Sequence, residues 1–273
     1  MKKHTTVFAL LWLCASFSIM AERSKTLAFE GEPIDKNVYA HGQLEEQLKD
    51  FSVFELNTER INAHVKSQYF DEKLHLKLGE QHDWKLHLFE NDVRAYNYLL
   101  KEIGNDRTTT LERTENITYK GFENSNNGGE VRLSIKNDWF WGMVTADKTE
   151  WIIQPISDFV ADAAANHFIV YDASDVLDSQ NRTCATNDAH HFANNTKIDE
   201  TAAKQAVVCQ SLELAMAADK SMFTKKGGTV GAADYLTSIV NLINPNYTAF
   251  ELEFIIVEQV VVSDTDPWTT STD

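Results

Sequence analysis

The last quarter of the chain has the pattern of a small α/β unit, and no other stretch restricts the fold as much. A strand pattern at residues 212–219 is followed by a short helical pattern at 222–226 and by two consecutive glycines. A longer helical pattern covers residues 232–242, and a second strand pattern covers 250–262. Two strands and two helices leave a sheet edge unpaired and an apolar helix face uncovered, so we expect this unit to begin a larger domain.

The amino-acid sequence of this quarter resembles the N-terminal part of the catalytic domain of the reprolysin (adamalysin, ADAM-like) zinc metallopeptidases. The resemblance is carried by the stretches LELAMAADKSMFTKKGG, YLTSIVNLINPNYTAFELEFIIVEQ and SDTDPWTTSTD. It implies that residues 207–273 are the N-terminal part of a zincin-like catalytic domain. It also implies that the completed protein is a metalloendopeptidase, which cleaves protein or peptide substrates with a zinc-activated water.

The motif that such an enzyme needs is absent from this sequence. Zincins hold zinc with two histidines one helical turn apart, and a glutamate beside the first takes a proton from water, which gives HExxH. None of the nine histidines is followed by glutamate. We therefore expect no catalytic residue in this chain, zinc ligands downstream of it, and no activity of the chain alone, as the N-terminal portion of a longer precursor.

The N-terminus has the pattern of a secretory signal peptide. Lys2 and Lys3 precede an apolar run that ends at the small residue Ala21. This run is shorter than the roughly 20 apolar residues of a membrane span. We therefore expect residues 1–21 to be cleaved, the protein to be secreted, and the exported part to have no membrane attachment.

The exported part is strongly acidic. Without residues 1–21 it has 23 basic and 41 acidic residues, a formal charge of −18. Such a charge repels phosphate backbones and anionic membrane surfaces. Nucleic acids are therefore not expected as partners.

The region before the last quarter has mainly strand patterns. Residues 22–44 are polar without a sustained period and predict an irregular lead-in. Period-two alternation predicts a hairpin of strands near 74–78 and 84–88. Residues 91–103 predict a short helix or an irregular excursion. Runs of β-branched and aromatic residues between Asn/Gly turns predict four more strands, at residues 117–122, 131–135, 139–145 and 150–156.

Residues 45–172 are thus expected to form a mainly β domain. Its stretches TYKGF, EVRLSI, WFWGMV and TEWIIQPI resemble the prodomain of ADAM-type peptidases, which implies a role in folding and latency. Residues 173–206 are polar, as is typical of a linker. An exposed polar linker is accessible to an activating protease, which we expect to cut within residues 187–207, with Lys197 and Lys204 as positions for a trypsin-like enzyme.

Few residues are candidates for metal binding or covalent bridges. The resemblance places Glu213 where reprolysin-like enzymes often have a carboxylate ligand for a structural calcium, and the alternative is a solvent-facing strand residue. The adjacent His190 and His191 are interpreted as solvated linker residues. Cys184 has three open interpretations, which are a disulfide with Cys209, a cysteine-switch ligand that occupies the open position on zinc as in related zymogens, or neither.

The sequence therefore predicts a mainly β prodomain followed by the start of an incomplete α/β zincin-like metallopeptidase domain, with zinc and calcium as the implied metals. The rival hypothesis is a non-catalytic secreted β-rich binding or inhibitor-like protein. The stretch ELAMAADKSMF argues against this rival, because a free prodomain has no need of that strand and helix.

Overall fold

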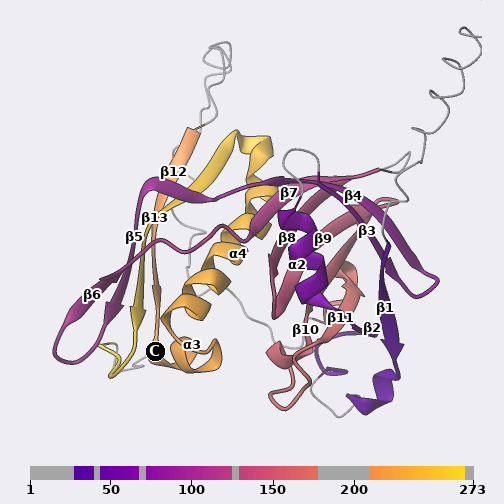
Figure 1. The fold of residues 1–273 in the computed structure, drawn as a ribbon, viewed down its shortest axis with the longest axis horizontal. Coiled ribbons are helices and arrows are strands. Elements are labelled where there is room, and N and C mark those ends of the chain that lie inside the picture. The colour runs from indigo at the N-terminus through magenta and orange to yellow at the C-terminus, as the bar shows by residue number, and fades with distance from the viewer. Residues whose placement is uncertain (1–27, 40–43, 68–71, 125–128, 178–209, 268–273) are drawn as a thin grey trace, which may run out of the picture.

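The computed structural model describes residues 28–39, 44–67, 72–124, 129–177 and 210–267. These residues form a closed barrel and a separate sheet, with a long helix between them (Figure 1). The mainly β character predicted from the sequence is confirmed. The predicted signal peptide and most of the predicted linker lie outside the described residues.

The barrel closes in the strand order β1-β2-β11-β10-β9-β8-β7-β4-β3, and its neighbouring strands are antiparallel except for the parallel pair β1 and β3. The hairpin predicted near residues 74–88 is β3–β4, and the four further predicted strands are β7 to β10. The bounds of the barrel strands are β1 Ala28–Ile34, β2 Ser52–Glu55, β3 Glu72–Leu78, β4 His82–Glu90, β7 Thr118–Glu123, β8 Glu130–Lys136, β9 Trp139–Ala146, β10 Thr149–Pro155 and β11 His167–Asp172.

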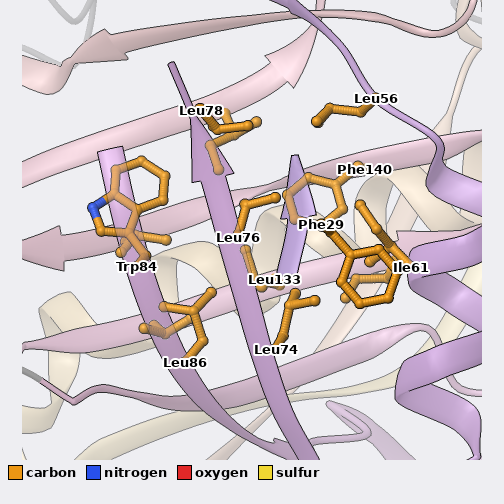
Figure 2. Close-up of a cluster of buried hydrophobic side chains, with 14 of the residues drawn as sticks. Phe29, Leu56, Ile61, Leu74, Leu76, Leu78, Trp84, Leu86, Leu133 and Phe140 are labelled. Atoms are coloured by element: carbon orange, nitrogen blue, oxygen red, sulfur yellow. The ribbon is translucent and has the colours of Figure 1, made fainter. Parts of the chain in front are cut away.

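Alternate side chains of the barrel strands point inward and form an apolar core. On β3, the side chains of Leu74, Leu76 and Leu78 are fully buried, as their period-two spacing predicts. Helix α2, Thr58–Lys66, adds Ile61 to the same cluster (Figure 2). Burial of this apolar surface is the main stabilising contribution to the barrel.

The second sheet has the strand order β12-β13-β5-β6. Strands β12, Gln210–Ala218, and β13, Leu252–Val262, are parallel, as are β13 and β5, Arg94–Ile103, whereas β6, Thr108–Leu111, is antiparallel to β5. Residues 210–262, which contain β12, the two helices and β13, are called the C-terminal α/β unit below. Its order of strand, helix, helix and strand confirms the pattern read from the last quarter of the sequence.

The two helices of this unit are separated by glycines, as predicted. Helix α3 spans Lys220–Lys225, and helix α4 spans Thr229–Tyr247, so α4 is longer than the predicted 232–242. Gly227 and Gly228 between them have φ values of +76° and +113°, which L-residues with a side chain rarely adopt. The chain can therefore change direction sharply between the two helices.

Two expectations about the first half of the chain were wrong. The segment 91–103 was expected to be a short helix or irregular, but it contains β5, whose alternate residues Tyr98 and Leu100 are buried under α4. The lead-in 22–44 was expected to be irregular, but it contains β1, which closes the barrel between β2 and β3. The remaining short elements are the 3₁₀ turns η1 Lys36–Val38, η2 Ile156–Asp158, η3 Ala173–Asp175 and η6 Thr248–Phe250.

Candidate functional site

The hairpin β5–β6 leaves the barrel and joins the sheet of the C-terminal α/β unit. Strand β4 precedes this hairpin and β7 follows it, yet β4 and β7 pair directly with each other, with Glu90 opposite Tyr119. The barrel is therefore closed without β5 and β6. In the described part of the chain, the strand partner of the hairpin outside itself is β13 (Figure 1).

Strand β5 and strand β13 are joined by paired backbones and by a buried polar network. Residues 99–103 of β5 lie beside residues 258–262 of β13 in parallel register. The hydroxyl of Tyr98 donates to Gln259 Oε1 at 2.5 Å, and Gln259 Nε2 donates to the carbonyl of Ala233 on α4 at 3.0 Å. Burial raises the pKa of Tyr98 to about 12, so the hydroxyl stays a donor across the physiological pH range. The network therefore links the hairpin, β13 and α4.

Helix α4 is also bonded to the outer wall of the barrel. The fully buried Asn241 donates through Nδ2 to the carbonyls of Tyr119 at 3.2 Å and Leu133 at 3.1 Å, which lie opposite each other on β7 and β8. Its Oδ1 accepts from Asn91 Nδ2 at 2.9 Å. One side chain of α4 thus satisfies polar groups from three segments of the barrel region.

Aromatic contacts extend this interface along α4. The ring of Tyr235 stacks on Trp141 of β9, with centroids 5.0 Å apart and planes inclined by 8°. The ammonium of Lys226 lies 3.8 Å from the centroid of the Tyr235 ring, within the range of a cation–π interaction. Burial raises the pKa of Tyr235. The phenol therefore remains neutral within this cluster.

A charged cleft of about 380 Å³ lies beside these rings, between the barrel and the α/β unit. Lys226 Nζ is 2.5 Å from Asp158 Oδ1, and these side chains are 13% and 16% exposed, so their ion pair is largely shielded from solvent. Lys136 Nζ is 2.9 Å from Asp234 Oδ2 across the same interface. Burial raises the pKa of the Asp234 carboxyl, and the nearby Lys136 ammonium partly offsets this effect.

Three aspartates that follow β13 or β12 bond the turn of the hairpin and the start of α3. Asp264 accepts from the backbone N–H of Asn105, in the β5–β6 turn, at 3.1 Å. Asp266 accepts from the backbone N–H of Lys220 at 2.6 Å. Asp219 accepts from the Met222 N–H at 2.7 Å and so caps the N-terminus of α3. These three carboxylates therefore orient turns and a helix start.

Of the residues with a predicted metal role, Glu213 lies within the described part of the chain and Cys184 does not. Glu213 is solvent-exposed on β12, as the alternative interpretation expects. The structural calcium that the resemblance implies stays a prediction, because its other oxygen ligands would lie downstream of this chain. Within the described residues, no cluster of three or more His, Cys, Asp or Glu side chains could hold a metal ion. Cys184, Cys209, His190 and His191 lie outside the described residues, so the disulfide and the cysteine switch remain predictions.

Two histidines of the β3–β4 hairpin are partly covered. His75 Nε2 lies 2.5 Å from Asp83 Oδ1 with its side chain 18% exposed, and His87 stacks on Phe122 at 4.8 Å. His82 is different, because its ring is buried inside the barrel against Trp84 and Trp151, and burial lowers its pKa to about 4.

The residues that form the interface were not identified from the sequence. Asn91, Asn241 and Gln259 are ordinary polar residues in their local patterns, and only the pairing of β5 with β13 brings them together. No helix among the described residues is long and apolar enough to cross a membrane. No protein-family model matches the chain, and no curated protein matches it either.

Proposed function

We propose that the chain is the N-terminal portion of a secreted zinc metalloendopeptidase zymogen, in which the barrel assists folding of the α/β unit and keeps it latent. The supporting observation is the hairpin β5–β6, which leaves a closed barrel to provide a strand to the sheet of the α/β unit. By resemblance to reprolysin-like precursors, the barrel would be the prodomain and the α/β unit the start of the catalytic domain, so this contact would join prodomain and enzyme. Zinc, held by residues further along the complete protein, would supply the activated water for peptide hydrolysis.

The contact suits a folding role for a physical reason. Parallel strands such as β12 and β13 form late because their pairing closes a long loop and requires a helical crossover. A preformed hairpin on the barrel offers β13 an edge to pair with, and the wall of β7–β9 offers α4 a surface. The barrel would thereby lower the entropy cost of assembling the α/β unit.

The sheet also leaves room for a completed domain. Strand β13 is paired on both sides, whereas β12 is paired in the described residues only with β13. Eight of the nine residues of β12 are uncharged, with Glu213 as the exception, so this edge lacks the charges that usually protect edge strands. Further strands of a zincin-like domain would pair with β12, opposite the side that the hairpin occupies.

Two measurements test the proposal. The reading frame beyond Asp273 is expected to encode HExxHxxGxxH, and the complete purified product is expected to cleave casein in a reaction that a zinc chelator abolishes. An immediate stop codon and a stable, zinc-free, inactive product would contradict the enzyme and support the rival binding protein. The folding role is tested by refolding residues 207–273 with and without residues 22–206 supplied in trans.

The sharpest control for the folding role is a barrel without the hairpin. Asn91 and Thr118 exchange backbone and side-chain hydrogen bonds, so a two-residue turn that joins them would delete β5–β6 and keep β4 paired with β7. The intact barrel is expected to promote folding of the α/β unit, followed by protection of β13 amides from hydrogen exchange. Equal promotion by the hairpin-deleted barrel, or full folding of residues 207–273 alone, would refute this role.

A further inference from the structure

We propose that the barrel holds the C-terminal α/β unit as a separate binding partner, so that cutting the connection between residues 177 and 210 leaves a two-chain complex. Release would then require β5 to leave β13, which the cut by itself does not cause. In the proposed zymogen this makes linker cleavage insufficient for activation. The inference itself rests on contacts between described residues, and it would hold for a non-catalytic protein as well.

The first support is the way in which the chain crosses between the two parts. The barrel and the hairpin are complete before residue 178, and the α/β unit begins at Gln210. The contacts between the two parts among the described residues are non-covalent, so none of them depends on an intact connection. A cut within residues 187–207 would leave every one of these contacts in place.

The second support is the backbone pairing of β5 with β13. It runs from Leu99 to Ile103 opposite Glu258 to Val262, and Lys101 Nζ lies 2.6 Å from Glu258 Oε2. If β5 left, β13 would expose a row of unpaired N–H and C=O groups, which is costly wherever water has restricted access. The contact of Asn105 with Asp264 extends this pairing into the turn of the hairpin.

The third support is the barrel-facing side of α4. Asp234, Ser238 and Asn241 lie on successive turns of this side and are 4%, 0% and 0% exposed. Asn241 and Asp234 make their bonds with the barrel region, to the carbonyls of β7 and β8 and to Lys136. A buried polar side chain with its partner removed carries a desolvation penalty, so these groups oppose a partial opening of the interface.

The experiment uses the exported chain with a specific protease site placed within residues 187–207. Cys184 is changed to serine, because a Cys184–Cys209 disulfide would span the cut and hold the fragments together covalently. After cleavage, gel filtration at about 1 µM is expected to give one peak that contains both fragments, as for an interface with a nanomolar Kd. Two separate peaks of folded fragments would overturn the inference.

A pair of matched variants tests whether the two fragments are held together by the contacts between α4 and the barrel. Asn241→Leu removes the bonds to β7 and β8 and is expected to weaken the nicked complex at least about tenfold. Asn62→Leu is the control, because Asn62 is a buried amide of α2 whose bond to Asn137 joins two segments of the barrel region. Equal weakening by the two changes would overturn the interface assignment.

A second, milder variant tests the same interface if Asn241→Leu does not fold. Lys226→Ala removes the Asp158 ion pair and the contact with Tyr235 at the surface of the cleft. It is expected to raise the dissociation rate of the nicked complex several-fold, and an unchanged rate would contradict the inference. An inactive complete gene product would refute the proposed enzyme without affecting co-elution, so the two proposals fail separately.

Discussion

The barrel interior and the interface with the C-terminal α/β unit are both buried, but they are built from different residues. The interior is a cluster of Leu, Ile, Val, Phe and other large apolar side chains around His82. The barrel-facing side of α4 instead contributes Asp234, Ser238 and Asn241, all hydrogen-bonded or ion-paired. A contact with so many polar side chains is more typical of an interface between two parts of a chain than of a single domain core.

Helix α4 shows the same difference within one element. Its sheet-facing side places Ala233, Leu236 and Val240 against β13 and β5, in an apolar cluster. Its barrel-facing side would be compatible with water once exposed, because each polar group there could exchange its partner for solvent. Strands β12 and β13 therefore belong to the permanent structure of the α/β unit, whereas the wall of β7–β9 occupies a side of α4 that tolerates separation, and β5 contributes to the apolar side.

The largest expected effect comes from truncating the barrel interior. Phe140 is fully buried and packs edge-to-face on Phe168, with ring centroids 6.4 Å apart. Phe140→Ala leaves a cavity and is expected to lower the free energy of unfolding by about 3–5 kcal/mol. Urea denaturation measures this loss, and a change below about 1 kcal/mol would contradict the tightly packed interior.

The next effect concerns the titration of His82. Its pKa is about 4 in the folded barrel against 6.5 when unperturbed, because burial disfavours the imidazolium. A lowered pKa means that the unfolded chain binds the proton more tightly, so this stability contribution is complete above pH 6.5 and is lost as the pH falls toward 4. The loss from this residue is expected to reach about 3 kcal/mol.

The measurement is the difference in unfolding free energy between wild type and His82→Phe across that pH range. The variant is expected to lack the fall that the wild type shows between pH 6.5 and 4. His75→Gln serves as the control, because His75 lies on the outer face of the barrel beside Asp83. Parallel pH profiles for the wild type and His82→Phe would refute the assignment.

A smaller effect is expected at the polar network of the interface. Gln259→Leu leaves the Tyr98 hydroxyl without its acceptor and is expected to cost about 1–3 kcal/mol, whereas the Ala233 carbonyl keeps the Thr237 hydroxyl as a donor. Adding Tyr98→Phe removes the stranded hydroxyl, so the double variant should recover part of the loss. A double-mutant cycle in urea measures the coupling, and strictly additive costs would show that the two side chains do not interact.

These comparisons also explain what could be predicted from the sequence. Strands β3 and β4 were recognisable because one face of each lies in a continuous core, which produces strict alternation. The C-terminal α/β unit was recognisable from glycines and from the change of period. Strand β5 was not, because Tyr96 and Leu99 are exposed and its register with β13 is interrupted.

The interface residues could not be predicted for a related reason. Asn91 and Asn241 are 150 residues apart, and Lys101 and Glu258 are 157 apart, so no local pattern connects them. A buried asparagine on a helix has the same local sequence signal as a solvated one. Only the excursion of the β5–β6 hairpin from the barrel makes these residues neighbours, and that excursion follows from long-range strand pairing.

The smallest expected effect tests whether β5 is held on β13 by its paired backbone or by the Lys101–Glu258 ion pair. Lys101 and Glu258 are 30% and 31% exposed, so Lys101→Ala is expected to cost less than about 1 kcal/mol, with a smaller cost at high salt. Lys66→Ala is the control, because the Lys66–Glu115 pair is 40% and 82% exposed and lies outside the β5–β13 contact. If β5 is held mainly by its backbone, both changes should leave hydrogen-exchange protection of β13 intact. Loss of that protection in Lys101→Ala alone would mean that the side-chain pair, and not the paired backbone, fixes the hairpin to the α/β unit.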